Sequence, residues 1–348
     1  MFSITVLISS ITIYFGLPIF ICGMIGNLIN IRLFWRARHN PCAFIFLFLS
    51  LINCIVLFYG LFIRILIIGF QLDWSTTNRF WCKTRAALTP ASFLISLTCI
   101  CLASIDRFFV SCRQKKYRKL SRLSLAKWAV ILICIFWLLH FVPYLIYTEL
   151  LRSPITDLMT CTLIRNEAFT NYLIYFAYPV YYGLLPSTTL MITGIMTYRN
   201  INKLQIVRQR QSIQKQLTSM MLILIPIILF STLPYVIVTE YTVLTVTMAK
   251  SSNRRAVELL ITNIVTTTCY ITFACPFCAF FVSSRSFRNE AKMLFLCRKT
   301  TLTRTNQIQP YSTSSSRNIQ SISMNTYRIP LNSTTIMKNM RPSIIHEE

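Results

Sequence analysis

Seven long apolar stretches run along this chain, and they constrain its fold more than any other feature of the sequence. A helix rises about 1.5 Å per residue and the hydrocarbon core of a bilayer is about 30 Å thick, so about 20 apolar residues can span it. The stretches that reach this length are 4–31, 42–70, 84–111, 126–148, 171–198, 217–247 and 256–281. The sequence therefore predicts an all-α membrane protein, a bundle of seven transmembrane helices.

The charged residues give this predicted bundle an orientation. The chain has 35 Lys and Arg residues against 10 Asp and Glu residues, a formal net charge of +25. If the N-terminus is outside, 26 of the basic residues and four of the acidic ones fall on the inner side. An excess of Lys and Arg is typical of cytoplasmic loops. We therefore expect the N-terminus outside, and we interpret the charge as a topology signal, with no nucleic-acid partner.

The composition changes near residue 298. The last 51 residues contain 16 Ser and Thr residues, no Cys and no Gly, and they show no sustained apolar period. Such a segment cannot bury enough apolar surface to fold by itself. We expect residues 1–297 to form the membrane domain and residues 298–348 a disordered cytoplasmic tail that is open to phosphorylation, with a plain solvated linker as the alternative.

The 13 Cys residues separate by their positions relative to the spans. Eight lie inside the apolar stretches, where Cys packs as a small hydrophobe, and three lie on the reducing inner side. Only Cys82 and Cys161 face the outside. We therefore expect a disulfide bond between them that ties the second outer loop over the third stretch. Cys275 and Cys278 form a CxxC inside the seventh stretch, where packing is favoured over a metal or redox site.

The inner end of the third stretch carries Asp106, Arg107 and Phe108. Arg107 follows Cys82 by 25 residues, which as a helix is about 37 Å, the distance between the two membrane faces. These motifs resemble those of a rhodopsin-like (class A) G-protein-coupled receptor, in which the inner motif is Asp-Arg-Tyr. The resemblance covers roughly residues 4–297 and is that of a divergent member.

Polar positions inside the spans agree with the family in part. Asn27 follows Gly26 as in the Gly-Asn pair of the family's first span, whose side chain bonds neighbouring helices. Asn53 stands in place of the family's buried aspartate, and Ser96 matches a serine of its sodium pocket. Because the carboxylate charge is missing, we expect no sodium binding.

The characteristic residues of the family are only partly present in the later spans. Trp128 resembles the tryptophan of span four, and Trp137 is the alternative. Pro186 and Pro234 match the prolines of spans five and six. Pro276 is what remains of the Asn-Pro-x-x-Tyr motif of span seven.

The resemblance also implies an activation mechanism. In the family, the arginine pairs with its neighbouring aspartate at rest, agonist binding moves span six outward, and the freed arginine contacts the G protein. These roles fall to Asp106 and Arg107, with Phe108 beside them; a pair that merely snorkels at the interface is the alternative. Thr232 occupies the place of the family's switch tryptophan, so the usual relay through span six is altered.

The segment after span seven resembles the family's short amphipathic eighth helix. Phe287, Ala291 and Leu294 share one face, as a helix lying in the membrane interface requires. Cys297 closes this helix and is a candidate for palmitoylation.

The resemblance implies a multi-pass plasma-membrane receptor that binds an extracellular ligand and activates a heterotrimeric G protein. The basic inner loops would contact both the G protein and anionic membrane lipids, and the tail would meet a receptor kinase and arrestin. No cofactor, metal or enzymatic activity is implied, and the sequence contains no Ser/His/Asp set, HExxH motif or P-loop.

Two known ligand classes conflict with the sequence. Amine receptors keep an aspartate where Thr89 stands, and retinal receptors need a lysine in the seventh span, whereas 256–281 has none. Acidic residues above an aromatic vestibule instead indicate a short cationic peptide, such as an amidated one ending in Arg-Phe. The neuropeptide (FMRFamide-like) receptor type is therefore our hypothesis. The candidate pocket residues are Thr89, Tyr144, Tyr175, Tyr235, Glu240 and Glu258.

Several alternatives stay open. Solvated outer acids and tyrosines that anchor the helices at the interface would give the same pattern. A small environmental molecule is a second ligand class, and a transporter or channel is a second class of protein. Ionisable residues inside spans mark transport paths, and the candidates here are Arg64 and His140. We expect Arg64 to snorkel to the outer interface and His140 to hydrogen-bond within the bundle.

Overall fold

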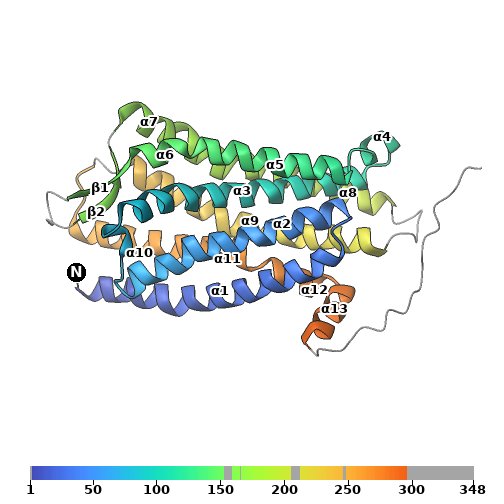
Figure 1. The fold of residues 1–348 in the computed structure, drawn as a ribbon, viewed down its shortest axis with the longest axis horizontal. Coiled ribbons are helices and arrows are strands. Elements are labelled where there is room, and N and C mark those ends of the chain that lie inside the picture. Colours follow the sequence, from blue (N-terminus) through green and yellow to red (C-terminus); the bar gives the residue numbers. More distant parts are fainter. Residues whose placement is uncertain (1, 153–158, 165, 205–211, 246–247, 296–348) are drawn as a thin grey trace, which may run out of the picture. The chain divides into compact units, whose positions relative to one another are not determined.

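The computed structural model of the protein describes residues 2–152, 159–164, 166–204, 212–245 and 248–295. Seven helical runs lie side by side in this part of the chain, and we refer to them as spans one to seven (Figure 1). In order, they are α1 (Phe2–Arg36); α2 (Pro41–Ile55) with the π-helical η1 (Val56–Phe62) and η2 (Ile65–Gly69); α3 (Arg79–Ser111); α5 (Leu123–His140) with α6 (Val142–Tyr147); α7 (Glu167–Tyr172), η4 (Leu173–Leu184) and α8 (Leu185–Leu204); α9 (Ser212–Leu244); and α10 (Ser252–Cys269), α11 (Ile271–Ala274) and α12 (Pro276–Ser283). The predicted seven-helix fold is confirmed.

Six helices of the described residues are long and apolar enough to cross a membrane. They correspond to spans one, two, three, four, six and seven. Span five is less apolar, because residues 171–198 include six tyrosines and four threonines, and its middle, η4, is π-helical and contains Pro179. The run from Glu167 to Leu204 is nevertheless continuous helix.

Side-chain caps determine where several spans begin. Asn40 accepts a hydrogen bond from the backbone N–H of Cys42, Asn78 accepts one from Trp81, and Ser251 accepts one from Arg254. Each bond satisfies one of the backbone donors that the first turn of a helix leaves without a partner. These polar residues therefore start spans two, three and seven at the ends of their apolar stretches.

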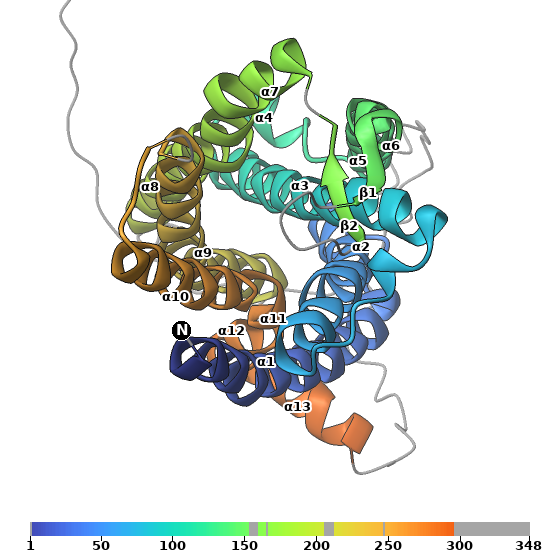
Figure 2. The same ribbon diagram turned by 90° about the vertical axis from the view of Figure 1, so that its left-hand side faces the viewer.

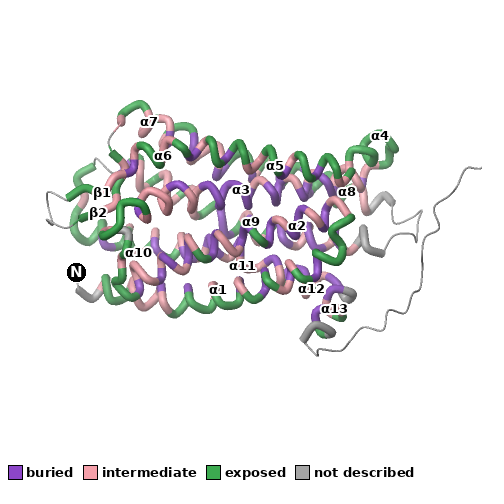
Figure 3. The backbone as a smooth tube through the Cα atoms, in the orientation of Figure 1, coloured by how far each residue is buried: buried purple, intermediate pink, exposed green. Residues whose placement is uncertain are grey.

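Span three is the centre of the bundle. Two thirds of its apolar window is buried inside the protein (67%), against 11% for span one. Figure 3 shows the same contrast, with buried residues concentrated along α3 and exposed ones along the outer face of α1. The exposed faces carry large apolar side chains, including Phe15, Leu132 and Phe230. In a lipid environment these faces are solvated by acyl chains.

A short β-hairpin covers one end of the bundle, which the sequence analysis did not predict. Strands β1 (Thr148–Arg152) and β2 (Met159–Leu163) pair antiparallel, with Leu150 opposite Cys161. Figure 2 views the spans end-on from this side and shows them in a ring, with β1 and β2 nearest the viewer. The hairpin follows span four and precedes span five, so it is part of the second outer loop.

The predicted eighth helix is present at the opposite end as α13 (Arg285–Phe295). Phe287 and Ala291 are buried, and the Phe287 ring lies 5.8 Å from that of Phe280 in span seven and 6.1 Å from that of Phe34 in span one. The side chain of Leu294, the palmitoylation candidate Cys297 and the predicted tail all lie outside the described residues.

Candidate functional site

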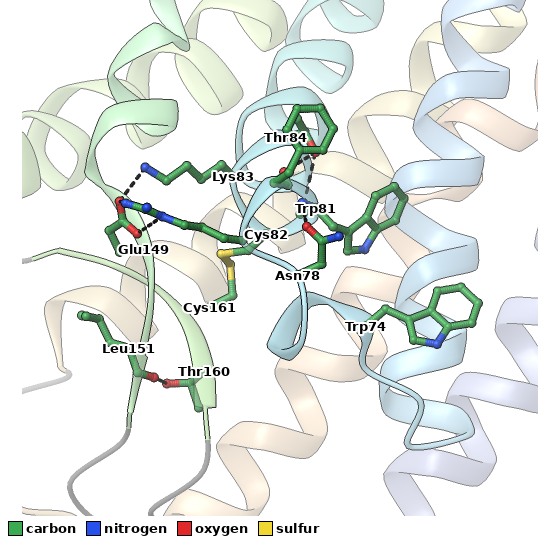
Figure 4. The surroundings of a disulfide bond; sticks show 12 residues. Trp74, Asn78, Trp81, Cys82, Lys83, Thr84, Glu149, Leu151, Thr160 and Cys161 are labelled. Carbon is green, nitrogen blue, oxygen red and sulfur yellow. Dashed lines mark hydrogen bonds and ion pairs between the residues drawn. A yellow bond between two sulfur atoms is a disulfide. The ribbon is translucent and has the colours of Figure 1, made fainter.

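A disulfide bond joins the hairpin to span three (Figure 4). It links Cys82, in the first turn of α3, to Cys161 in β2, with their Cα atoms 5.7 Å apart. This is the pairing that the sequence predicts. We refer to this side of the bundle as the disulfide end.

Ion pairs hold the hairpin beside the disulfide. The Glu149 carboxylate accepts hydrogen bonds from Arg79 Nε at 2.8 Å and Nη2 at 2.6 Å, and Lys83 Nζ lies 2.6 Å away. The bonds from Arg79 and Lys83 lower the pKa of Glu149 to about 2. The first turns of α3 therefore hold β1 by charge and β2 by a covalent bond.

A cavity of about 280 Å³ lies within the bundle at the disulfide end. Its lining comes from spans three, five, six and seven and from α6: Ala86, Thr89, Pro90, Phe93, Tyr144, Tyr178, Tyr182, Tyr235, Thr266, Cys269 and Tyr270. Five of these are tyrosines, which present apolar faces and polar hydroxyl groups to the same space. We call this the inner cavity.

A second cavity of about 390 Å³ lies against the hairpin, and its lining includes Arg85 and Cys161. We call it the outer cavity. The two cavities share Ala86, Thr89 and Pro90 of α3, so they adjoin along one face of span three. The hydroxyl oxygen of Thr89 is buried there and has no hydrogen-bond partner in the described part of the chain.

Phe93 links four spans within the inner cavity. Its ring centroid lies 4.7 Å from that of Phe273 in span seven, 5.4 Å from that of Tyr182 in span five and 5.9 Å from that of Tyr235 in span six. Sequence reasoning did not select Phe93. Its spacing of one helical turn from Thr89, a pocket candidate, is the signal that could have found it.

Some of the predicted pocket residues line a cavity in the structure and others do not. Thr89, Tyr144 and Tyr235 line the inner cavity, whereas Tyr175 does not, because it points away from the bundle and is 70% exposed. The prediction for Tyr175 is therefore wrong. Glu240 is not among the lining residues of either cavity.

Glu258 also lies outside both cavities. Its carboxylate contacts Lys250 Nζ at 2.5 Å and Arg254 Nε at 2.9 Å, and it accepts a hydrogen bond from the Tyr241 hydroxyl at 3.0 Å. Two cations of the chain itself compensate this acid. Glu258 is therefore not the open anionic site that the sequence analysis expects.

Arg64 points into the bundle, so the expectation that it snorkels outward is wrong. Its Nη2 donates to Asn263 Oδ1 at 2.8 Å, and Asn263 Nδ2 donates to Thr12 Oγ1 at 3.0 Å. Asn263 and Thr12 are both buried. The side-chain amide of Asn263 accepts the hydrogen bond that water would accept if Arg64 reached the membrane interface. His140 lies within the bundle as expected, with Nε2 3.4 Å from the Tyr172 hydroxyl.

A chain of hydrogen bonds crosses the middle of the bundle at three predicted residues. Ser96 Oγ donates to Asn53 Oδ1 at 2.6 Å, and Asn53 Nδ2 donates to Asn27 Oδ1 at 3.4 Å. Asn27 Nδ2 then donates to the backbone carbonyl of Phe273 at 2.9 Å. Spans three, two, one and seven are therefore joined by neutral polar groups. No carboxylate takes part in these bonds.

Spans six and seven meet at a cluster of hydroxyl groups. Thr272 Oγ1 lies 2.6 Å from Ser231 Oγ and 3.2 Å from Thr232 Oγ1, and all three residues are buried. Thr232 is the residue that replaces a tryptophan of the family. A hydrogen bond between helices therefore stands where a large ring would pack, and the sequence analysis did not find its partners Ser231 and Thr272.

The opposite end of the bundle contains a buried ion pair. Arg107 is 1% exposed, and its guanidinium donates to the Asp106 carboxylate through Nε at 3.1 Å and also through Nη2. The other Asp106 oxygen accepts a hydrogen bond from Ser121 Oγ at 2.5 Å. Ser121 lies between α4 (Lys115–Arg118) and α5, so the loop between spans three and four helps to hold the pair. The Phe108 ring lies tilted against that of Phe109, with ring centroids 5.8 Å apart.

Of the two tryptophans considered for span four, the structure buries Trp137 and exposes Trp128. Trp128 is 62% exposed, whereas Trp137 is 4% exposed and donates from Nε1 to Thr98 Oγ1 in span three at 2.9 Å. The prediction that Trp128 lies in the helix core is therefore wrong, because its helix turns that residue outward.

The prolines of the later spans lie within or at the start of helices. Pro234 is inside α9 and Pro276 begins α12, which interrupts span seven after α11. The carbonyl of Pro186 in α8 accepts a weak hydrogen bond from Cys101 Sγ at 3.9 Å.

A bundle of seven spans, closed by a disulfide-tied hairpin at one end and holding a buried Asp-Arg pair at the other, is the architecture of a seven-transmembrane receptor. The model of the 7 transmembrane receptor (rhodopsin family) matches residues 26–289, most of the chain, and the protein belongs to this family. It is thus a G-protein-coupled receptor and not an enzyme, and it is a multi-pass protein of the plasma membrane. Individual comparison with curated proteins gives no match. The disulfide end is extracellular, and the Asp106 end is cytoplasmic.

Proposed function

We propose that this receptor binds a short peptide in its two adjoining cavities and in response activates a heterotrimeric G protein through Arg107. The continuity of the outer and inner cavities along Thr89 is the observation that carries the ligand part. Together they lead from the hairpin to Phe93, a path suited to an elongated ligand. Tyrosines and threonines along it offer both stacking faces and hydrogen-bonding groups, as peptide recognition requires.

Phe93 supports a route from the ligand to the cytoplasmic end. It contacts Tyr235 of span six and Phe273 of span seven. One turn further from the ligand, the hydroxyl cluster of Ser231, Thr232 and Thr272 joins the same two spans. A ligand that displaces Tyr235 changes the packing of span six against span seven, and the hydroxyl cluster can exchange partners at small cost.

Asp106 and Arg107 support the G-protein part. A guanidinium that is 1% exposed cannot contact a cytoplasmic partner until the surrounding helices separate. The pair with Asp106 and the bond from Ser121 stabilise the closed arrangement. Outward movement of span six would uncover Arg107 and Phe108 together and create a positive docking surface for the G protein.

The test is a cell-based panel of G-protein activation reporters, with synthetic peptides applied to the full-length receptor. We expect at least one peptide to activate a G protein, and Arg107→Ala to abolish that response at equal surface expression. Arg255→Ala, which changes an exposed basic residue at the outer start of span seven, is the matched control and should retain it.

Three outcomes contradict the proposal. An undiminished response in Arg107→Ala would remove the assigned role of this residue. Activation by small environmental molecules with no response to any peptide would favour a chemosensory receptor. Ligand-dependent current without G-protein activation would favour a channel.

A further inference from the structure

We propose that the ligand of this receptor carries a carboxylate, which binds the Arg64 guanidinium between spans two and seven, behind Tyr270 of the inner cavity. The inference rests on the proposed use of the cavity as the ligand site. It replaces the amidated, cationic ligand that the sequence suggests with one that has an acidic end.

Arg64 is a half-buried cation whose hydrogen bonds are incomplete. It lies between the two π-helical segments of span two, and its side chain turns toward span seven. Nη2 donates to Asn263, whereas the Nε–H is buried and has no acceptor among the described residues. An unsatisfied charged donor in a membrane interior is costly, and such residues are retained for function.

No carboxylate of the described residues forms an ion pair with Arg64. Its partner Asn263 is a neutral amide that also bonds Thr12. Buried charges in proteins are ordinarily paired with an opposite charge. The positive charge of Arg64 is therefore left for a group that comes from outside the described chain.

Arg64 itself lines neither cavity, but its hydrogen-bond partner Asn263 lies about two helical turns before Tyr270, which lines the inner one. Gly60, one turn before Arg64, lets the Tyr270 ring lie directly against span two, since a Cβ at residue 60 would be 2.7 Å from Tyr270 Cε1. A ligand group that passes the Tyr270 ring therefore comes close to the Arg64 guanidinium.

The outer cavity is lined by one cation and one acid, Arg85 and Asp73. The two other acids near the rim, Glu149 and Glu258, already bind lysines and arginines of the chain. The entrance therefore offers no uncompensated acid at either of these positions to attract a cationic ligand.

Glu240 on span six provides a negative charge. Its Oε2 is buried and has no hydrogen-bond partner in the described structure, and Glu240 lies five residues after Tyr235 of the inner cavity. Arg64 and Glu240 are thus oppositely charged groups on different spans. A ligand with a carboxylate and a separate donor, such as a peptide with a free C-terminus, satisfies both.

The carboxylate can be a peptide C-terminus, an acidic side chain or a small organic acid, and guanidinium binds each with the same parallel hydrogen bonds. We therefore design the test on matched pairs: every peptide with a free C-terminus and as its amide, every acidic side chain beside its Asn or Gln analogue, and every organic acid beside its amide. Responses are measured with the reporter panel, and binding is measured by the thermal shift of the purified receptor.

In the wild-type receptor, we expect the acid of an active pair to be at least about tenfold more potent than its neutral analogue, the effect of one hydrogen bond between charged groups. In Arg64→Gln the ratio should fall toward one, and in Arg64→Lys it should be intermediate. Arg255→Gln, an exposed charge at the outer start of span seven, is the control and should leave the ratio unchanged.

The potency ratio of acid to neutral analogue distinguishes a role of Arg64 in ligand binding from a purely structural role. If Arg64 only joined spans one, two and seven, Arg64→Gln would weaken acid and amide equally. An equal loss, a preference of the wild type for amides, or no acid that produces a response or a thermal shift would each overturn the inference. Peptide activation with amide preference would leave the proposed function standing, whereas activation by a non-peptide acid alone would retain the carboxylate and reject the peptide.

Discussion

Single residues in this receptor act through the polar groups that surround them. Asp106 accepts hydrogen bonds from Arg107 and Ser121, which come from different segments of the chain. Ser121 is the member of this set that no motif marks. It lies in the loop after span three, and its hydroxyl reaches the carboxylate oxygen that Arg107 leaves open.

Loss of the Ser121 hydroxyl should raise ligand-independent signalling. A hydrogen bond to a charged group contributes about 1.5–3 kcal/mol, and this one exists only while the loop and the ion pair are together. We expect Ser121→Ala to increase basal G-protein activation several-fold at equal surface expression. Ser124→Ala, which removes an exposed hydroxyl nearby, should not, and equal basal activity in the two variants would show that the bond does not restrain the receptor.

Glycines on the spans set how closely helices and rings approach. Gly60 of span two faces the Tyr270 ring, with an added Cβ only 2.7 Å from Cε1, whereas Gly194 of span five faces the flexible end of Ile225 at 3.0 Å. An aromatic ring held between helices cannot yield, but an isoleucine methyl can rotate.

Gly60→Ala should therefore destabilise the receptor more than Gly194→Ala. Forced overpacking costs about 1–3 kcal/mol, so we expect a clear loss of thermal stability and surface expression in Gly60→Ala and a small one in Gly194→Ala. The melting temperature of each purified variant measures this. Equal melting temperatures would mean that span two moves aside without cost.

The hairpin depends on its ion pairs in a pH-dependent way. Hydrogen bonds from Arg79 and Lys83 lower the pKa of Glu149 to about 2 from its ordinary value near 4.5. A carboxylate whose pKa is lower in the folded than in the unfolded state stabilises the fold at pH values above its ordinary pKa. This stabilisation is lost as the pH falls toward the pKa of the folded state. The contribution is therefore constant at neutral pH and declines only between about pH 4.5 and pH 2.

Glu149→Gln tests this dependence. The difference in melting temperature between wild type and Glu149→Gln should be constant from pH 8 to pH 5 and shrink below pH 4.5, and it should be modest because Arg79 is exposed and salt screens the pair. Glu167→Gln, at an exposed acid of α7, is the control and should show no such trend. If the difference in melting temperature changed between pH 8 and pH 5, the ion pairs of Glu149 would not be its cause.

At the scale of the whole molecule, span three connects the two ends. Thr89, Phe93 and Ser96 follow each other at helical spacing along its buried side, and Asp106 and Arg107 close it. They meet in turn the two cavities, the aromatic contacts, the central hydrogen-bond chain and the cytoplasmic ion pair. A central buried helix thus contacts the two cavities, the aromatic cluster of Phe93, the central hydrogen-bond chain and the ion pair.

Composition and spacing along the chain determined the number of spans, their orientation and the Cys82–Cys161 bond, because span length, loop charge and the location of a thiol are local properties. The direction in which each helix faces is not local. In a membrane both faces of a span are apolar, so no amphipathic period marks the inner side. Only the tertiary structure decided that Trp137 and not Trp128 is buried, that Tyr175 points outward and Arg64 inward, and that Glu258 is already paired, since each depends on which neighbouring helix supplies a partner.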